Sequence, residues 1–212
     1  TLRSMAQDIL DYAGSRGASA CETDVSEGFG QSVSVRMGSV ETIEYNRDKG
    51  VGVTVYLGQR RGYASTSDFS RAALHATVDA ALSIAGFTAP DEAAGLPEAE
   101  LLARGETDLD LYHPWTLPVE EAIDIARRCE AAAFAVSPLV KNSEGASVSA
   151  QQSHFVSANS LGFMGGYASS RHYLSCSVIA GKGDAMQRDD WYSTHRDAGD
   201  LAEPEVIGEY GA

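Results

Sequence analysis

Five histidines are the side chains best suited to hold a metal ion or move a proton in this 212-residue chain. They lie far apart, and no two stand at the spacing of a His-x-x-His or H-E-x-x-H zinc motif. The sequence also contains no G-x-S-x-G, Walker or G-x-G-x-x-G motif. A structural role is therefore favoured over metal ligation for each of them, and we expect an exposed side chain for the one in mid-helix, His75. The other four are His113, His154, His172 and His195.

The adjacent pair Arg171 and His172 is the most suggestive candidate for a binding site. Neighbours on a strand point to opposite faces, so these two cannot line one pocket together. Two interpretations stay open. In the structural one, which is favoured, Arg171 pairs across strands with an acid such as Asp189 or Asp190 while the imidazole packs in the core. In the functional one a substrate contacts this pair. Tyr167, a further candidate, is more typical of a core or cross-strand aromatic than of a ring that stacks on a ligand.

Composition argues against several classes of function. The formal net charge of −14 opposes a nucleic-acid partner, because binding to phosphates requires a basic surface. No run approaches the roughly 20 apolar residues of a membrane span, and the start of the chain does not show the pattern of a signal peptide. We expect a cytoplasmic protein whose three cysteines, Cys21, Cys129 and Cys176, are reduced and buried.

Helical and alternating patterns follow one another in the first half of the chain. Residues 2–12 have the apolar spacing of an amphipathic helix with Thr1 or Ser4 as its cap, and a second helix runs from a cap at Ser67 or Asp68 to Gly86. Between them, alternation predicts strands at residues 32–37, 40–46, 51–57 and 62–67, with turns at 28–30 and 46–50.

The second half repeats this order after an irregular stretch. Residues 88–115 lack periodicity and contain three prolines. A helix then begins with Pro118 in its first turn and is closed by Pro138. The acidic residues 200–212 are expected to start a connection. Strands are predicted at 139–143, 146–151, 154–159, 163–170, 173–180 and 186–194.

A ten-residue pattern, L-G-x-x-x-G-Y-A-S-[ST], occurs at residues 57–66 and again at 161–170. Its first glycine is expected to turn the chain between two strands. Because each copy lies in a β-rich segment after an amphipathic helix, we expect an α+β fold of two helix-plus-antiparallel-meander units, packed as layered mixed α/β sheets. The expected domains are 1–90, an N-terminal α+β domain, and 116–212, a second β-rich α+β domain, joined by a connecting segment at 91–115.

Several stretches resemble one known family. Residues 166–172, Gly-Tyr-Ala-Ser-Ser-Arg-His, and 186–190, Met-Gln-Arg-Asp-Asp, are similar to sequences of the TldD/PmbA family, also called modulators of DNA gyrase. Residues 50–66 and the Ala-rich helix at 69–86 resemble the N-terminal domain of that family. Asn-Ser-Leu-Gly at 159–162 looks closer to the PmbA (TldE) branch than to TldD.

The resemblance implies properties that the residue patterns themselves do not show. In this family a TldD-like subunit carries an H-E-x-x-x-H zinc motif and works in a TldD–PmbA heterodimer that cleaves unfolded or flexible peptides, including a peptide-antibiotic precursor and an antitoxin. PmbA-type subunits lack the zinc ligands. Family members continue into a large C-terminal domain, so we expect this chain to be a fragment that holds the first two domains. It has no counterpart of the zinc motif, so no catalytic residue or metal ligand can be carried over.

The expected function is that of a PmbA/TldE-like subunit of a metallopeptidase, supplying scaffold and peptide-binding surface. Tyr167, Arg171 and His172 are its candidate substrate-binding residues. No cofactor is expected in this chain, and zinc is expected in the TldD-like partner. The other expected partners are unfolded or extended peptides, with no direct nucleic acid and no membrane; a homodimer in isolation stays open. Two alternative functions also stay open: a non-enzymatic interaction module, and a self-sufficient metallopeptidase with ligands beyond residue 212.

Overall fold

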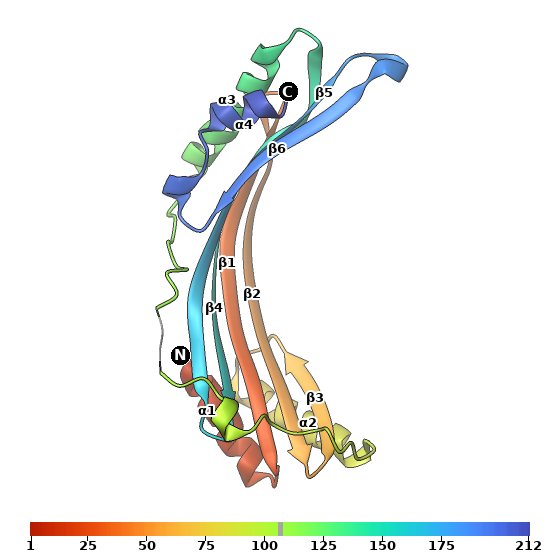
Figure 1. Ribbon diagram of the computed structural model, residues 1–212, viewed down its shortest axis with the longest axis vertical. Coiled ribbons are helices and arrows are strands. Elements are labelled where there is room, and N and C mark those ends of the chain that lie inside the picture. Colours follow the sequence, from red (N-terminus) through yellow and green to blue (C-terminus); the bar gives the residue numbers. More distant parts are fainter. Residues whose placement is uncertain (106–107) are drawn as a thin grey trace. The chain divides into compact units, whose positions relative to one another are not determined.

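The computed structural model describes residues 1–105 and 108–212, so residues 106–107 of the predicted connection lie outside the described part. Each half of the chain runs helix, three strands, helix (Figure 1), where the sequence patterns predicted more and shorter strands and no helix at the end of the second half. The elements are α1 (Leu2–Ser15), β1 (Ala20–Arg36), β2 (Ser39–Leu57), β3 (Arg60–Thr66), α2 (Arg71–Phe87), the 3₁₀ turn η1 (Ala99–Leu101), α3 (Val119–Val136), β4 (Val140–Asn159), β5 (Met164–Ala180), η2 (Gly183–Ala185), β6 (Gln187–His195), η3 (Ala198–Asp200) and α4 (Pro204–Tyr210).

The six strands form one sheet in the order β3-β2-β1-β4-β5-β6. The pairs β2–β3 and β5–β6 are antiparallel, and the expected α+β class is confirmed. The pairing of β3 with β2 extends from Val51 to Leu57 of β2. Within the described residues, the outer edge of the preceding stretch of β2, residues 39–50, therefore has no strand beside it.

By its internal contacts the chain forms two compact units, each assembled from separate segments. Unit 1 comprises Thr1–Gly28, Asp48–Leu109 and Ser153–Ala168, and unit 2 comprises Phe29–Arg47, Asp110–Gln152 and Ser169–Ala212. The sequence domains at 1–90 and 116–212 stay a prediction, because the compact units follow contacts in space and not consecutive stretches of chain.

In unit 1, α1 and α2 pack on the strands through fully buried apolar side chains such as Ile9, Val53 and Val78. Removing such side chains from water stabilises the unit by roughly 1.5–3 kcal/mol each. Thr1 caps α1 by accepting from the Ser4 amide at 3.2 Å, as predicted. The cap of α2 is Ser70, two residues beyond the predicted Asp68, because its hydroxyl accepts from the Ala73 amide.

In unit 2, α3 and α4 cover a second core that includes Val35, Leu174 and Ile207. Gly208 allows α4 to approach α3 closely. A Cβ atom there would overlap the Cys129 carbonyl oxygen and lie 2.9 Å from the Ala133 nitrogen. The prediction that residues 200–212 only begin a connection is therefore wrong, since this segment contains a packed helix.

The two copies of the repeat are hairpin ends of unit 1. Gly58 and Gly162 have φ angles of +60° and +90° and turn the chain from β2 to β3 and from β4 to β5, as predicted. The next repeat glycines, Gly62 and Gly166, allow close packing, because a Cβ atom would overlap the carbonyl oxygen of Ala81 or Phe155. The repeat thus marks two turns of the same compact unit and not corresponding positions in two units.

Two predicted turns are wrong. Residues 28–30 lie inside β1 and residues 46–50 lie inside β2, so each of these strands is continuous. Likewise the segments predicted as separate strands at 139–159 merge into β4, and those at 163–180 into β5. Glycine and polar residues interrupt the hydrophobic alternation at these places, but pairing with neighbouring strands maintains the extended backbone.

Candidate functional site

The three candidate residues do not converge on one site. Tyr167 belongs to unit 1, whereas Arg171 and His172 belong to unit 2. In the unit 2 part of β5, the even-numbered residues from 170 to 178 are buried while the odd-numbered ones are more exposed. This alternation places the imidazole of His172 on the covered face and Arg171 on the opposite face, as their adjacency predicts.

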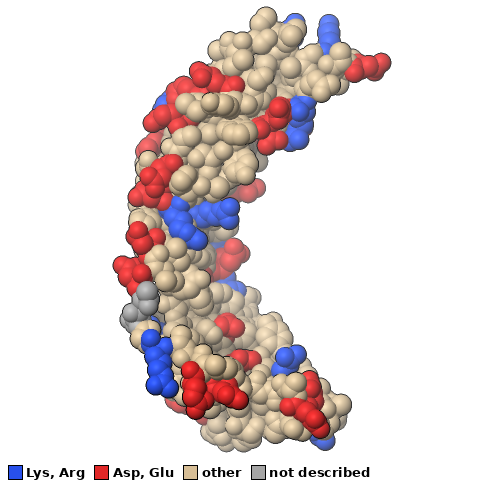
Figure 2. All heavy atoms as spheres, viewed as in Figure 1, with Lys and Arg blue, Asp and Glu red and all other residues tan. Residues whose placement is uncertain are grey.

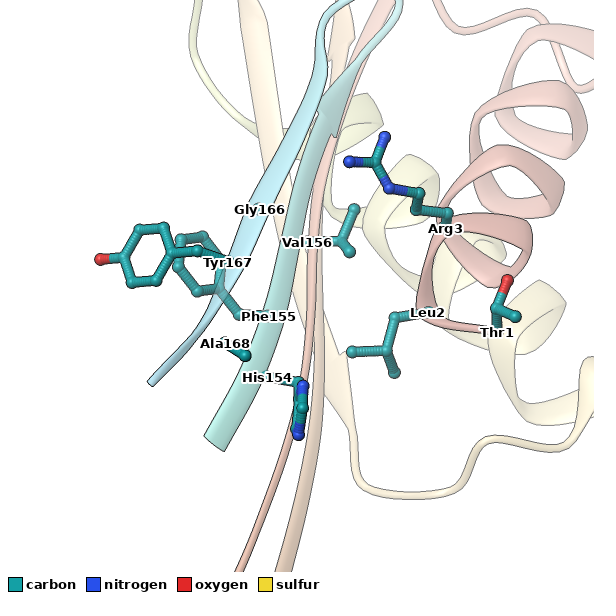
Figure 3. A pocket seen from close by; sticks show the side chains of 9 residues that line it. All are labelled: Thr1, Leu2, Arg3, His154, Phe155, Val156, Gly166, Tyr167 and Ala168. Carbon is teal, nitrogen blue, oxygen red and sulfur yellow. The ribbon is translucent and has the colours of Figure 1, made fainter. Parts of the chain in front are cut away.

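Tyr167 lines a shallow depression of about 250 Å³ beside the start of α1. Figure 3 shows the rings of Tyr167 and Phe155 on one side of β4 and β5, with Leu2 and Val156 on the other. The two rings meet edge to face, with centroids 4.6 Å apart and planes at 81°. Because Tyr167 is 45% exposed and packs on Phe155, its geometry is that of a cross-strand aromatic pair on an open sheet face.

His172 is 1% exposed and holds the chain segment that leads into α3. Its Nε2 is 2.9 Å from the His113 carbonyl oxygen, which can only accept, so Nε2 carries the proton. The imidazole also meets Trp115 edge-on at 5.4 Å. Next to it, the Ser170 hydroxyl accepts from the His113 amide at 2.8 Å. These contacts fix residues 113–115 against β5, which is the packed role that the structural interpretation gives to His172.

Arg171 does not pair with Asp189 or Asp190. The strand register places those two residues opposite Val178 and Ser177, six or more positions along β5, which is about 20 Å away at the rise of a strand. The Arg171 Nε instead donates to the Thr194 hydroxyl at 3.2 Å. The predicted acidic partner is therefore wrong, and whether Arg171 contacts a substrate stays a prediction.

A metal ion does not fit the side chains of the described residues, where no group of three or more His, Cys, Asp or Glu comes together. The cysteines are buried free thiols. Burial, with a smaller contribution from Glu22, raises the pKa of Cys21 to about 12. Such a thiol stays protonated near neutral pH and is a poor ligand or nucleophile. No catalytic step through a metal is derived for this chain.

Acidic and basic side chains are mixed on the surface. On the face shown in Figure 2, Lys and Arg occur singly or in small groups between Asp and Glu. That face offers no continuous basic track for a phosphate backbone. Among the described helices, none has both the length and the apolar composition needed to cross a bilayer.

Sequence reasoning missed a cavity of about 330 Å³ within unit 2. Its walls come from β1, β2, β4 and the segment before α3, and they include Phe29, Gln31, Tyr45 and Trp115. A long apolar side chain at a solvent-facing strand position, such as Phe29 or Tyr45, was the available sequence signal. It could not show that these positions meet in space.

Both halves of the chain match models of one protein family. Residues 21–85 match the model described as PmbA/TldA metallopeptidase domain 1, and residues 112–211 match the PmbA/TldA metallopeptidase central domain. Two relatives are similar over most of the chain. A protein named Metalloprotease PmbA homolog from Haemophilus influenzae is 40% identical over 98% of this chain and 46% of its own length. Metalloprotease PmbA from Escherichia coli O157:H7 is 44% identical over 88% of this chain and 42% of its own length.

Solved structures of the same fold are more distant in sequence. A protein described as a modulator of DNA gyrase from Bacteroides thetaiotaomicron superposes with a TM-score of 0.89 at 23% identity, covering 98% of this chain and 48% of its own. TldE from Thermococcus kodakarensis superposes with a TM-score of 0.77 at 16% identity, covering 98% and 46%. This chain therefore spans less than half the length of the relatives that it matches.

Proposed function

Since the chain belongs to the PmbA/TldD metallopeptidase family, we propose that it is the PmbA/TldE-like part of a peptidase assembly in the cytoplasm, in which a TldD-like subunit supplies the zinc ion. In this assembly the chain provides scaffold and a surface for unfolded or extended peptides. The observation that carries the proposal is the match of both halves to family domains at 40–44% identity to PmbA proteins.

The outer edge of β2 in unit 2 gives this proposal a physical basis for peptide binding. Along residues 39–47 the strand is extended, and no described strand lies beside its outer edge. Val40, Ile43 and Tyr45 of this stretch are 38%, 44% and 68% exposed. An extended peptide could add there through main-chain hydrogen bonds, which bind with little dependence on side-chain identity. Binding that depends little on side chains suits a peptidase that cleaves flexible peptides of varied sequence.

Reconstitution tests the subunit assignment. The full-length protein is mixed with a TldD-like protein, recovered by affinity pull-down, and assayed for peptide cleavage with and without added zinc. We expect cleavage by the mixture, and its loss when the zinc ligands of the TldD-like protein are replaced. Cleavage by the full-length protein alone, with stoichiometric bound metal, would contradict the assignment and favour a self-sufficient metallopeptidase.

Backbone methylation tests the edge-binding step separately. Peptides that are N-methylated at successive positions lose one main-chain donor each. Since each hydrogen bond contributes about 1 kcal/mol, alternate positions should weaken binding about fivefold and the positions between them should not. Equal affinity for all the methylated peptides would rule out strand addition while leaving the subunit assignment intact.

A further inference from the structure

The cavity of about 330 Å³ in unit 2 has the composition of a ligand site. Its size lies at the lower end of the range for small-molecule pockets. It borders the apolar core of unit 2 at Leu117, which belongs to both. The side chains on which the argument rests are Phe29, Gln31, Tyr45, Trp115, Leu117 and Gln152.

Three aromatic rings, those of Phe29, Tyr45 and Trp115, line the cavity. Phe29 and Tyr45 are 38% and 68% exposed. Trp115 is held from behind by its edge-on contact with the buried ring of His172. This contact holds the Trp115 part of the wall in place, so binding of a flat apolar group does not have to order that ring.

None of the residues that line the cavity carries a charge. Its polar groups include the carboxamides of Gln31 and Gln152, and the oxygen of Gln152 accepts from the Tyr112 hydroxyl at 2.8 Å. The Nε2 atom of Gln31 is buried and has no hydrogen-bond partner within the described residues. A buried donor left without a partner is unfavourable, and a ligand that supplies an acceptor removes this penalty.

We propose that this cavity binds an uncharged stretch of extended peptide, with an aromatic or large apolar side chain between the rings and a main-chain amide on Gln31. This inference rests on the proposed function for the origin of the peptide, which is the substrate of the assembly. The uncharged lining disfavours charged side chains. A peptide group carries both a donor and an acceptor, so it satisfies either orientation of the Gln31 amide.

Tyr45 connects the cavity with the open edge of β2. It belongs to the stretch of β2 at residues 39–47, beside whose outer edge no described strand lies, and it also lines the cavity. A peptide strand beside this stretch therefore has one side chain close to the cavity while its main chain pairs with β2. The cavity would add a preference for aromatic residues to an otherwise sequence-tolerant edge.

Photo-crosslinking tests the site in the full-length protein without requiring catalysis. The probe is acetyl-Ala-benzoylphenylalanine-Ala-amide, and the crosslinked residue is mapped by mass spectrometry. We expect crosslinks at residues that line the cavity. Acetyl-Ala-Phe-Ala-amide should suppress them at a concentration at least tenfold lower than acetyl-Ala-Ala-Ala-amide. Gln31→Leu should weaken competition by the Phe peptide about fivefold, the factor expected for one hydrogen bond, and Gln187→Leu on β6 is the matched control.

Tyr45→Ala provides a second variant, because this exposed side chain contributes little to folding and should be tolerated. The Tyr45→Ala substitution should weaken competition by acetyl-Ala-Phe-Ala-amide more than it weakens competition by acetyl-Ala-Ala-Ala-amide. Crosslinks outside the cavity, or equal competition by the two peptides, would overturn the proposal. Since the readout needs no TldD-like partner, such a result leaves the subunit assignment standing. Conversely, crosslinking at the cavity in a protein that forms no active assembly would support the site and contradict the assignment.

Discussion

The carboxylate of Glu130 accepts a hydrogen bond from the main-chain amide of Gly38 at 2.7 Å, and its other oxygen accepts from the neighbouring Met37 amide at 2.9 Å. Glu130 lies in α3 and is 2% exposed. The turn that it holds joins β1 to β2. One turn before it on α3, Arg127 donates through Nε to the Gly38 carbonyl oxygen at 3.0 Å. A helix that lies 89 to 93 residues further along the sequence therefore fixes the tip of this hairpin.

Replacing Glu130 with Ala should destabilise the protein by about 3 kcal/mol, because two amides lose a charged acceptor in a buried place. Glu130→Gln keeps the shape but has only one accepting oxygen, so about half of that loss is expected. Urea unfolding measures both variants. Glu121→Ala, an exposed substitution in the same helix, is the control and should change the free energy of unfolding by less than about 0.5 kcal/mol. A Glu130→Ala protein as stable as this control would show that the turn does not depend on the carboxylate.

Met37 has a φ angle of +52° and Gly38 one of +74°. Positive φ at both central residues is what a two-residue type I′ hairpin requires, and Asn-Gly is its preferred sequence. A methionine in the left-handed region is strained by roughly 1 kcal/mol. Met37→Asn should therefore raise the free energy of unfolding by about 0.5–1 kcal/mol. The same substitution at Met186, whose φ is −66°, is the control and should not stabilise the protein.

Gly62→Ala should destabilise unit 1 by about 2–3 kcal/mol through overpacking. A methyl group at this position of β3 would overlap the Ala81 carbonyl oxygen in α2 and lie 2.6 Å from the Ala85 nitrogen. Because both neighbours are backbone atoms, they cannot rotate away. Gly14→Ala in α1 is the matched control, since no described atom outside its own turn of helix lies within 4 Å of its added methyl group. That change should be neutral or stabilising, because alanine favours helix. Similar melting temperatures for the two variants would contradict the packing argument.

Stability should fall at acid pH partly through Asp8. Burial raises the pKa of this carboxyl, but hydrogen bonds from Arg71 and His75 outweigh it and hold the pKa below the usual value of 3.8. A carboxyl whose pKa is lower when folded contributes stability above its unfolded pKa and loses it as pH falls through the folded value. Asp8→Asn should thus lower the free energy of unfolding by up to about 1 kcal/mol at neutral pH. Below about pH 4 the variant should lose less stability with falling pH than the parent protein does.

The control for this titration is Asp11→Asn on the same helix, where the carboxylate accepts from the neutral Gln7 amide at 2.8 Å. Free energies of unfolding are compared from neutral pH down to about pH 2 for both variants. If Asp8→Asn and the parent protein show parallel pH profiles, the contacts of Asp8 with α2 do not contribute to stability.

Local patterns predicted α1, α2, α3 and the class of fold well, because each of these helices carries an apolar stripe that is complete within its own residues. The stripe around Leu74 and Val78 and the cap at Thr1 need no distant partner to be recognised. The seven-residue helix α4 escaped prediction because its burial depends on close approach at Gly208, which only the fold reveals. The full lengths of β1 and β2 were also not predicted, because backbone pairing continues where the alternation of apolar and polar side chains stops.

The candidate site was less predictable than the fold. The cavity is lined by side chains from segments up to 152 − 29 = 123 residues apart, including the rings of Phe29 and Trp115 and the amide of Gln152. No spacing rule links such positions. His172 attracted attention as a polar residue beside Arg171, yet its imidazole is used to hold residues 113–115 in place.

The stretch of β2 beside whose outer edge no described strand lies also affects the colloidal behaviour of the protein. An open strand edge of this length is a template for pairing with other copies, which leads to aggregation. Charged residues occur throughout the stretch, at Glu41, Glu44, Arg47, Asp48 and Lys49. Pairing of two copies of this edge would bring these charged side chains together at a cost in free energy. They therefore protect the edge against aggregation. The same edge can thus stay soluble at high concentration and still accept a partner strand of different composition.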